Sequence, residues 1–258
     1  MDLHLADRVA LISGSSKGLG LASARALAAE GCRVVLSARG QEALGAAERE
    51  IAAIAGADRV HAVAADLSTA EGAEAVMAAT IARFGGLDIL VNNVGKAGGT
   101  DIVSTPDDEW QAAFDHTLYP AIRLSRLAVP HMRRAGGGVI LMIASIWGRE
   151  SGGRMTYNAV KAAEISVAKG MAQQLAKDNI RVNSIAPGSI LFPGGSWEQR
   201  LRDTPDVVNE MIRRDLPFGR LGKDHEVGDV VAFLASPRAG WISGASITVD
   251  GGQSRSNI

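Results

Sequence analysis

The first forty residues contain a strand, a glycine-rich turn, a helix and a second strand in direct succession, and this order constrains the fold more than any other feature. The apolar run 8–13 predicts a buried strand, and the alanine-rich stretch after Gly20 predicts a helix that ends near Gly31, before the second strand. Gly14, Gly18 and Gly20 would let the backbone turn tightly and approach a pyrophosphate at a helix N-terminus, although such glycines also close ordinary loops. We therefore expect a unit that binds a dinucleotide.

Strand-like and helix-like stretches alternate along the rest of the chain. Helices are predicted over 41–55, 70–84, 107–134, 156–177 and 225–235, and strands over 59–64, 87–91, 138–143, 180–185 and 246–249. This alternation predicts a doubly wound α/β fold, with a parallel sheet covered by helices on both faces. The chain has 258 residues without a repeat or linker, so we expect a single domain over 1–258. Pro120 predicts a kink or break in the long helical stretch around it.

Composition and charge exclude several classes of protein. A hydrophobic content of 47% is enough for a sizeable core, and a net charge of −1 offers no basic field for nucleic acid. The longest apolar stretches have only strand length, so we expect no membrane span. The start Met1-Asp2-Leu3-His4 shows no secretory signal, and the single cysteine, Cys32, cannot form an internal disulfide. We therefore expect a cytoplasmic protein in which Cys32 is a core residue.

Tyr157 and Lys161 lie four residues apart at the start of a predicted helix, and Ser145 ends an apolar strand twelve residues before Tyr157. Residues at this spacing share a helix face, so the Lys161 ammonium would lie beside the Tyr157 phenol and lower its pKa. A phenol normally titrates near pH 10, too high for efficient proton exchange at neutral pH. The trio is a candidate site for moving a proton to or from an oxygen, although Tyr and Lys at this spacing are more often a solvated face.

Together, the motifs resemble the short-chain dehydrogenase/reductase family, in its roughly 250-residue branch that includes 3-oxoacyl reductases. The resemblance covers the whole chain. Its motifs are Ser13-Gly14-Ser15-Ser16-Lys17-Gly18-Leu19-Gly20, Asp66, Asn92-Asn93-Val94-Gly95, Ser145, Tyr157 with Lys161, Asn183 with Pro187-Gly188, and Val249-Asp250-Gly251-Gly252. It implies a seven-stranded Rossmann-type sheet in the order 3-2-1-4-5-6-7. It also implies hydride transfer between a nicotinamide cofactor and a ketone or secondary alcohol.

The same resemblance implies roles for individual residues. Tyr157 is the expected general acid or base, Ser145 hydrogen-bonds the reacting oxygen, and Lys161 lowers the phenol pKa and holds the nicotinamide ribose. From its type alone, Ser145 would more often cap a loop. The expected cofactor-binding residues are Gly14, Ser16, Lys17, Gly18, Leu19, Gly20, Arg39, Asp66, Leu67, Asn93, Gly95, Tyr157, Lys161, Pro187, Gly188 and Ile190. The histidines show no metal-ligand spacing, so no metal is expected.

Charges near the second predicted strand favour NADP over NAD. Family members that use NAD place an acid at the end of this strand, whereas this chain reads Ser37-Ala38-Arg39. Lys17 and Arg39 are similar to the basic pair that grips the 2′-phosphate in NADP-dependent members, and a guanidinium suits phosphate. Both cations are also compatible with an ordinary solvated surface. We expect NADPH to be the preferred cofactor.

Thr117 departs from the family pattern. The family usually carries an asparagine seven residues after a tryptophan, here Trp110, where it holds a water that links the lysine to solvent. A threonine hydroxyl could keep that water, so we count Thr117 among the catalytic candidates, or the proton could leave by another route. Loss of efficient chemistry is the alternative. The protein would then bind NADP in a regulatory or structural role.

The segment 189–219 is expected to cover the substrate as a lid. Phe192, Trp197, Met211 and Trp147 could form an apolar wall or pack the lid on the body. We expect a small ketone or alcohol, or an oxoacyl thioester on a carrier protein, as the substrate. The thioester would call for basic residues near the site, and the candidates are Arg149, Arg154, Arg200, Arg202, Arg213 and Arg214.

Assembly is expected as well. The Ala-, Leu- and Val-rich faces of 107–134 and 156–177 would otherwise be exposed apolar strips. By the resemblance these segments pair subunits, so we expect a homo-oligomer, specifically a tetramer.

Overall fold

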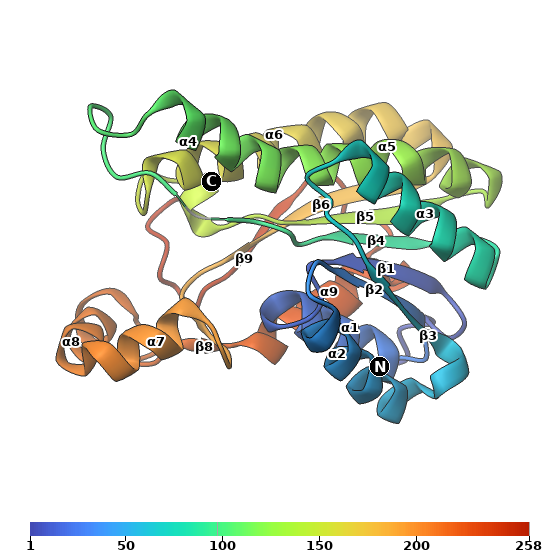
Figure 1. The fold of residues 1–258 in the computed structure, drawn as a ribbon, viewed down its shortest axis with the longest axis horizontal. Helices are drawn as coiled ribbons and strands as arrows, with labels where there is room; N and C mark the ends of the chain where they lie inside the picture. The colour runs from blue at the N-terminus through green and yellow to red at the C-terminus, as the bar shows by residue number, and fades with distance from the viewer. Residues whose placement is uncertain (97, 258) are drawn as a thin grey trace.

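A computed structural model describes residues 1–96 and 98–257. Its main sheet has seven parallel strands in the order β3-β2-β1-β4-β5-β6-β9 (Figure 1). These strands are β1 (Val9–Ser13), β2 (Arg33–Ala38), β3 (Val60–Ala64), β4 (Ile89–Asn92), β5 (Gly138–Ile143), β6 (Ile180–Pro187) and β9 (Ser246–Val249). The predicted order is confirmed. The seventh strand is β9 because β7 (Ile190–Leu191) and β8 (Gly222–Lys223) pair in a separate small ribbon.

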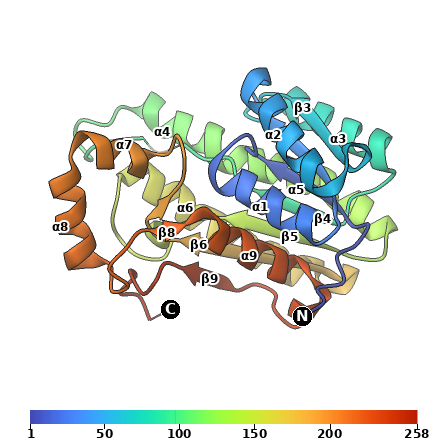
Figure 2. The same ribbon diagram turned by 90° about the horizontal axis from the view of Figure 1, so that it is seen from below.

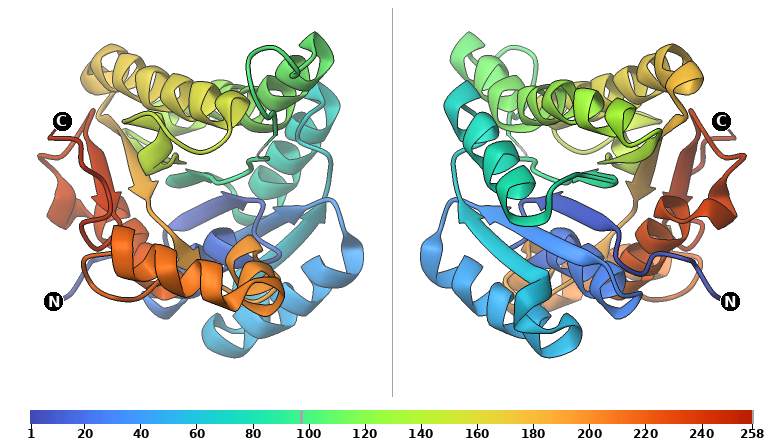
Figure 3. Two further views of the ribbon diagram at one scale, coloured as in Figure 1. Left: turned by 90° about the vertical axis from the view of Figure 1, so that its left-hand side faces the viewer. Right: turned by 90° about the vertical axis from the view of Figure 1, so that its right-hand side faces the viewer.

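Helices cover both faces of the sheet, as predicted. They are α1 (Gly18–Ala29), α2 (Gln41–Ala55), α3 (Ala70–Phe84), α4 (Asp107–Ala113), α5 (Tyr119–Arg134), α6 (Met155–Leu175), α7 (Ser196–Asp203), α8 (Pro205–Asp215) and α9 (Asp224–Ala235). Helices α1, α2 and α9 lie on one face, and α3, α5 and α6 lie on the other (Figures 1 and 3). Helices α7 and α8 project beyond one end of the sheet (Figure 2) and belong to the segment expected as a lid.

The strands are buried on both sides, which explains why the strand sequences are almost continuously apolar. In β1, all five residues are buried. Ala10 and Ile12 belong to the core under α1, α2 and α9, whereas Val9 and Leu11 belong to the core under α3, α5 and α6. This alternation follows from the two-residue period of a strand. Cys32 is fully buried in the first of these cores, as predicted.

The predicted break in the 107–134 stretch lies directly before Pro120. Five residues, Phe114–Leu118, form a π-helical turn between α4 and α5, and Pro120 occupies the first turn of α5. Proline has no N–H and its ring clashes with the carbonyl four residues earlier, so a wider turn accommodates it. This turn carries His116 and Thr117 into the region of the site.

The outer face of α6 differs from the predicted apolar strip. Its exposed positions include Ala162, Ser166, Lys169, Gly170 and Gln173, which are small or polar. Of the apolar residues of this helix, Val160, Ala168, Ala172 and Leu175 are buried, whereas Ile165, Val167 and Met171 are half-buried. In the described part of the chain, no helix is both long and apolar enough to cross a membrane.

Candidate active site

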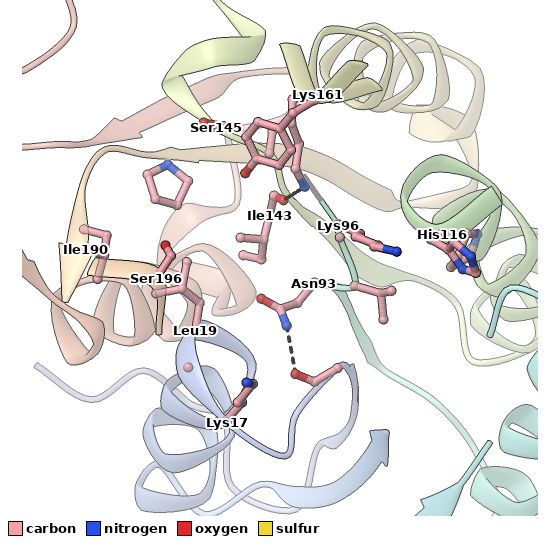
Figure 4. A pocket seen from close by; sticks show the side chains of 18 of the residues that line it. Lys17, Leu19, Asn93, Lys96, His116, Ile143, Ser145, Lys161, Ile190 and Ser196 are labelled. Carbon is pink, nitrogen blue, oxygen red and sulfur yellow. Dashed lines mark hydrogen bonds between the residues drawn. The ribbon is translucent and has the colours of Figure 1, made fainter. Parts of the chain in front are cut away.

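A cavity of about 930 Å³ opens at the carboxyl ends of the parallel strands, where successive loops diverge. Figure 4 shows Ser145 and Lys161 on one side of it and Leu19 and Lys17 on the other. The predicted site residues that line it are Gly14, Ser16, Lys17, Gly18, Leu19, Arg39, Asp66, Leu67, Asn93, Gly95, Ser145, Tyr157, Lys161, Pro187, Gly188 and Ile190. Gly20 and Thr117 are not among the lining residues. One cavity therefore joins the glycine turn to the Ser-Tyr-Lys trio.

The turn between β1 and α1 has the form expected for binding an anion. Gly14 and Gly18 have φ values of +63° and +58°, a region that favours glycine. Buried Ser15 fixes the turn, since its hydroxyl donates to the Ile12 carbonyl at 2.9 Å and accepts from the Ser37 N–H at 2.9 Å. No side chain caps the N-terminus of α1. Its first N–H groups are therefore available to a phosphate, and the turn fits a dinucleotide.

Asn93 joins β4 to the glycine turn. Its side-chain amide donates to the carbonyls of Ser13, at 3.1 Å, and Gly14, at 3.0 Å, and its N–H donates to the Ser13 hydroxyl at 2.9 Å. Gly20 lies behind this contact. A Cβ atom there would meet the Gly14 oxygen at 2.4 Å and the Asn93 amide nitrogen at 2.5 Å. Gly20 thus permits close packing under the turn rather than bordering the cavity.

At the other end of the cavity, Arg39 and Asp66 follow β2 and β3. Arg39 is exposed, and within the described residues it forms no hydrogen bond or ion pair. Hydrogen bonds from Ser68 lower the pKa of the Asp66 carboxyl, and the charges of Arg39 and His116 lower it further. Lys17 is also exposed and makes a long contact, 3.4 Å, to the Gly194 carbonyl in the expected lid. Both predicted phosphate cations are thus available at the rim.

The Ser-Tyr-Lys trio is assembled where β5 ends and α6 begins. Ser145 follows β5 and caps a short 3-10 turn, Ile146–Gly148, by accepting the Trp147 N–H at 3.2 Å. This is the capping role considered from the sequence, and the Ser145 hydroxyl proton is still available to the cavity. The turn packs closely on α6, since a Cβ at Gly148 would lie 2.6 Å from the Lys161 carbonyl carbon. Gly148 thereby fixes the distance between the serine and the helix that carries Tyr157.

Lys161 is held deep in this wall. Its side chain is 3% exposed, and the ammonium donates to the Ile143 carbonyl at 2.7 Å and to the Glu164 carboxylate at 2.8 Å (Figure 4 shows the first contact). It lies 5.6 Å from the centre of the Tyr157 ring. Burial alone would lower the pKa of Lys161, but Glu164 and Tyr157 outweigh burial and raise it. Lys161 therefore keeps its charge beside the phenol.

Thr117 lies behind the cavity wall. It is fully buried, and its hydroxyl accepts the Lys96 N–H at 3.2 Å. A Cβ built on Gly95 would lie 3.6 Å from the Thr117 methyl and 3.2 Å from the Lys161 nitrogen. Gly95 therefore lies between Thr117 and Lys161, in close contact with both side chains. The hydroxyl is thus engaged with the backbone that leads away from Asn93.

The expected lid contributes to the cavity through its first part. Phe192, Trp197 and Trp147 line the cavity, whereas Met211 does not. A Cβ at Gly18 would touch the Phe192 ring at 2.8 Å, so the lid rests on the glycine turn.

Among the six arginine candidates, Arg154 and Arg200 line the cavity. The Arg200 guanidinium stacks 4.8 Å from the centre of the Trp197 ring. By contrast, Arg202, Arg213 and Arg214 each pair with an acidic residue on their own helix.

Three residues of the site region escaped the sequence reasoning: Lys96, His116 and Glu164. Lys96 and His116 line the cavity and immediately neighbour motif positions, which was a usable signal. Glu164 is 1% exposed and lies three residues after Lys161, on the same helix face. The three-residue spacing from Lys161 was the signal for this residue, because positions three apart share a helix face.

Comparisons with known proteins agree with the geometry. A family model described as enoyl-(acyl carrier protein) reductase matches residues 14–254. The 3-oxoacyl-[acyl-carrier-protein] reductase FabG of Staphylococcus aureus is 32% identical over 244 residues, which cover 94% of this chain and 96% of that protein.

Two solved structures resemble the whole chain. L-sorbose reductase of Gluconobacter frateurii, complexed with NADPH and L-sorbose, is 37% identical, has a TM-score of 0.93, and matches over 99% of this chain and all of its own. A 7α-hydroxysteroid dehydrogenase complexed with NADH and 7-oxo glycochenodeoxycholic acid is 31% identical, with a TM-score of 0.90 over 99% of this chain and 97% of that one.

Proposed function

The chain belongs to the short-chain dehydrogenase/reductase family of oxidoreductases, and on that ground we propose that it interconverts a ketone and a secondary alcohol with NADPH as the preferred cofactor. One observation carries this proposal. The glycine turn, Tyr157, Lys161 and Ser145 line a single cavity at the carboxyl ends of the strands. A dinucleotide along this cavity would have its phosphates at the turn and its reactive ring near Tyr157.

The chain's own residues account for proton transfer and positioning. NADPH, when bound, supplies the hydride that reduces the carbonyl carbon. Tyr157 donates its proton to the carbonyl oxygen, and the Ser145 hydroxyl hydrogen-bonds the same oxygen as negative charge develops on it. The Lys161 ammonium favours the ionised phenol. In the reverse direction, ionised Tyr157 accepts the proton of a secondary alcohol.

The NADPH preference rests on Arg39 and Lys17. Arg39 is exposed at the cavity rim and forms no hydrogen bond or ion pair among the described residues, and no acid ends β2. Replacing Arg39 by Asp should weaken NADPH binding by roughly 1.5–3 kcal/mol, the value of one charge-assisted hydrogen bond, and should affect NADH much less. Calorimetric titration of both cofactors measures this. Tighter binding of NADH than of NADPH by the unaltered protein would contradict the preference. The comparison is needed because one similar structure is complexed with NADH.

For the substrate, we propose a small ketone or a 3-oxoacyl group. Arg154 and Arg200 border the cavity beside Trp147 and Trp197, so one end of it offers both apolar and positively charged contacts. We also propose that residues 1–258 form a single domain and that the segment 189–219 is the lid over its active site.

We further propose a cytoplasmic homotetramer. Light scattering that shows a stable monomer at micromolar concentration would count against that assembly.

A panel of ketones, oxoacyl thioesters and secondary alcohols, each assayed with NADP and NAD in both directions, tests the activity. Tyr157→Phe keeps the ring but removes the transferable proton, so turnover should fall by at least about a hundredfold while NADPH binding is retained. Equal turnover of Tyr157→Phe and the unaltered protein would refute the acid role. Cofactor binding without turnover of any panel member would favour a regulatory or structural NADP-binding protein instead.

A further inference from the structure

Glu164 forms a buried ion pair directly behind the proposed active site. Its carboxylate lies 2.8 Å from the Lys161 ammonium, and the side chains are 1% and 3% exposed. The second ammonium contact, to the Ile143 carbonyl at 2.7 Å, comes from the end of β5. Two fixed acceptors thus hold the ammonium, one neutral and one charged. No step of the proposed reaction uses the carboxylate.

A buried carboxylate at this place has an electrostatic consequence for Tyr157. The Lys161 ammonium lies 5.6 Å from the centre of the phenol ring, and its positive charge favours the ionised phenol. A negative charge 2.8 Å behind that ammonium opposes this effect. Little water intervenes at such burial, so the opposition is weakly screened. The net charge that faces the phenol ring therefore depends on whether Glu164 is ionised.

We propose that Glu164 is a positioning residue for proton transfer at Tyr157: it fixes the Lys161 ammonium and sets how strongly that ammonium favours the ionised phenol. This inference rests on the proposed function, because it concerns the proton that Tyr157 gives or accepts.

The surroundings of Glu164 make its charge responsive near neutral pH. Burial raises the pKa of the Glu164 carboxyl to about 7, even with Lys161 alongside to lower it. Strand β5 and the Ile146–Gly148 turn bring no charged side chain to this region. Charged side chains on the other elements packed on α6 are Asp107, Asp108, Glu109, Asp115, His116, Lys177, Asp178 and Arg181.

Several of these neighbours are engaged elsewhere. Glu109 accepts the Gly99 N–H, Asp115 accepts from Gln111, and Asp178 pairs with Arg133. Among the described residues, Lys161 is the charged group that acts on the Glu164 carboxyl. Protonation of this carboxyl, whose pKa is about 7, would remove the negative charge behind Lys161. Above about pH 7 the carboxylate offsets part of the Lys161 charge, so the electrostatic field at the phenol depends on the state of Glu164.

The test is the pH profile of alcohol oxidation, which requires loss of a proton from the Tyr157–Lys161 pair. In the unaltered protein, the rate of alcohol oxidation should rise with pH over a wider range than the titration of one proton would give. Glu164→Gln keeps an acceptor for Lys161 but removes the negative charge, so the rise should narrow to one proton and move to lower pH by about one unit. Glu164→Asp keeps the charge and should keep the broad profile. Exposed Glu74 on α3 provides the matched control, and Glu74→Gln should leave the profile unchanged.

A second measurement needs no substrate or cofactor. Infrared spectra of protein labelled with ¹³C-carboxyl glutamate should show a protonated buried carboxyl that disappears as the pH rises through about 7. This labelled band should be absent in Glu164→Gln. If Glu164→Gln does not fold, the band should be absent in Glu164→Asp, because the aspartate carries no label.

The outcomes separate the two proposals. A Glu164→Gln profile with the midpoint and width of the unaltered protein would overturn the positioning role, as would the lack of a Glu164 carboxyl band near neutral pH. If the unaltered protein oxidises no alcohol while the band titrates as expected, the proposed function fails and the charge change at Glu164 stands.

Discussion

Replacing Gly20 by Ala tests whether this glycine supports the turn or touches the cofactor. The new Cβ would lie 2.4 Å from the Gly14 oxygen and 2.5 Å from the Asn93 amide nitrogen, so backbone or amide must shift by roughly 1 Å to reach van der Waals contact. Overpacking of this kind costs about 1–3 kcal/mol. Loss of one or both Asn93 hydrogen bonds to the turn adds about 1 kcal/mol each. The gain in helix propensity returns about 1 kcal/mol. We expect a net loss of roughly 1–4 kcal/mol in the free energy of unfolding.

Urea unfolding followed by circular dichroism measures this loss, and calorimetric titration measures NADPH affinity in parallel. Gly45 on α2 is the matched control, because its Cβ would meet only the flexible end of Arg49 at 3.7 Å. Gly45→Ala should therefore stabilise the protein by about 0.5–1 kcal/mol without changing NADPH affinity. Gly20→Ala should lower stability and affinity together, since the displaced turn is the proposed phosphate site. If affinity falls while stability does not, Gly20 contacts the cofactor directly and the packing argument is refuted.

Three further changes probe the same scaffold. Gly148→Ala would place a Cβ 2.6 Å from the Lys161 carbonyl carbon, so turnover should fall at least about tenfold from a shift of the Ser145 turn, and unchanged kinetics would show that the turn adapts. Thr117→Val should cost about 1–3 kcal/mol in urea unfolding because the Lys96 N–H loses its acceptor, and a larger solvent isotope effect on turnover would add support for a proton relay. Burial raises the pKa of the Cys32 thiol to about 12, above its unfolded value, so its contribution to stability is present below the unfolded pKa and lost as pH rises through the alkaline range. Stability curves of the unaltered protein and Cys32→Ala should therefore converge with rising pH.

The α/β alternation could be predicted from local sequence patterns, and the strand order from the family that the motifs resemble. The apolar strand β1, the glycines after it and the spacing of Tyr157 and Lys161 are readable without tertiary contacts. Contacts between distant segments were not readable. Nothing local indicates that Phe192 rests on Gly18, or that Gly20 faces Asn93, because register and loop packing set these approaches.

Helix faces were harder still. The Ala-rich sequence of α6 gave an expected apolar outer strip, yet its exposed positions include Ser166, Lys169 and Gln173. The same misreading hid Glu164, since a carboxylate in an Ala-rich helix reads as a solvent-facing residue until the inner face is located. The packing of α6 on β5 and β6 shows which face of the helix is buried and which is exposed.

The placement of counter-charges follows from the burial of each cation. Arg39, Arg154 and Arg200 lie at the exposed rim, where water solvates each guanidinium. Lys161 has no such hydration, because only 3% of its side chain reaches solvent. A buried ammonium without a partner tends to lose its proton, and a neutral amine would no longer favour the ionised phenol. Glu164 thus keeps Lys161 charged before any ligand binds, and the same carboxylate weakens the influence of that charge on Tyr157. The buried contact between Glu164 and Lys161 therefore has two consequences: Lys161 keeps its positive charge, and the effect of that charge on Tyr157 is reduced.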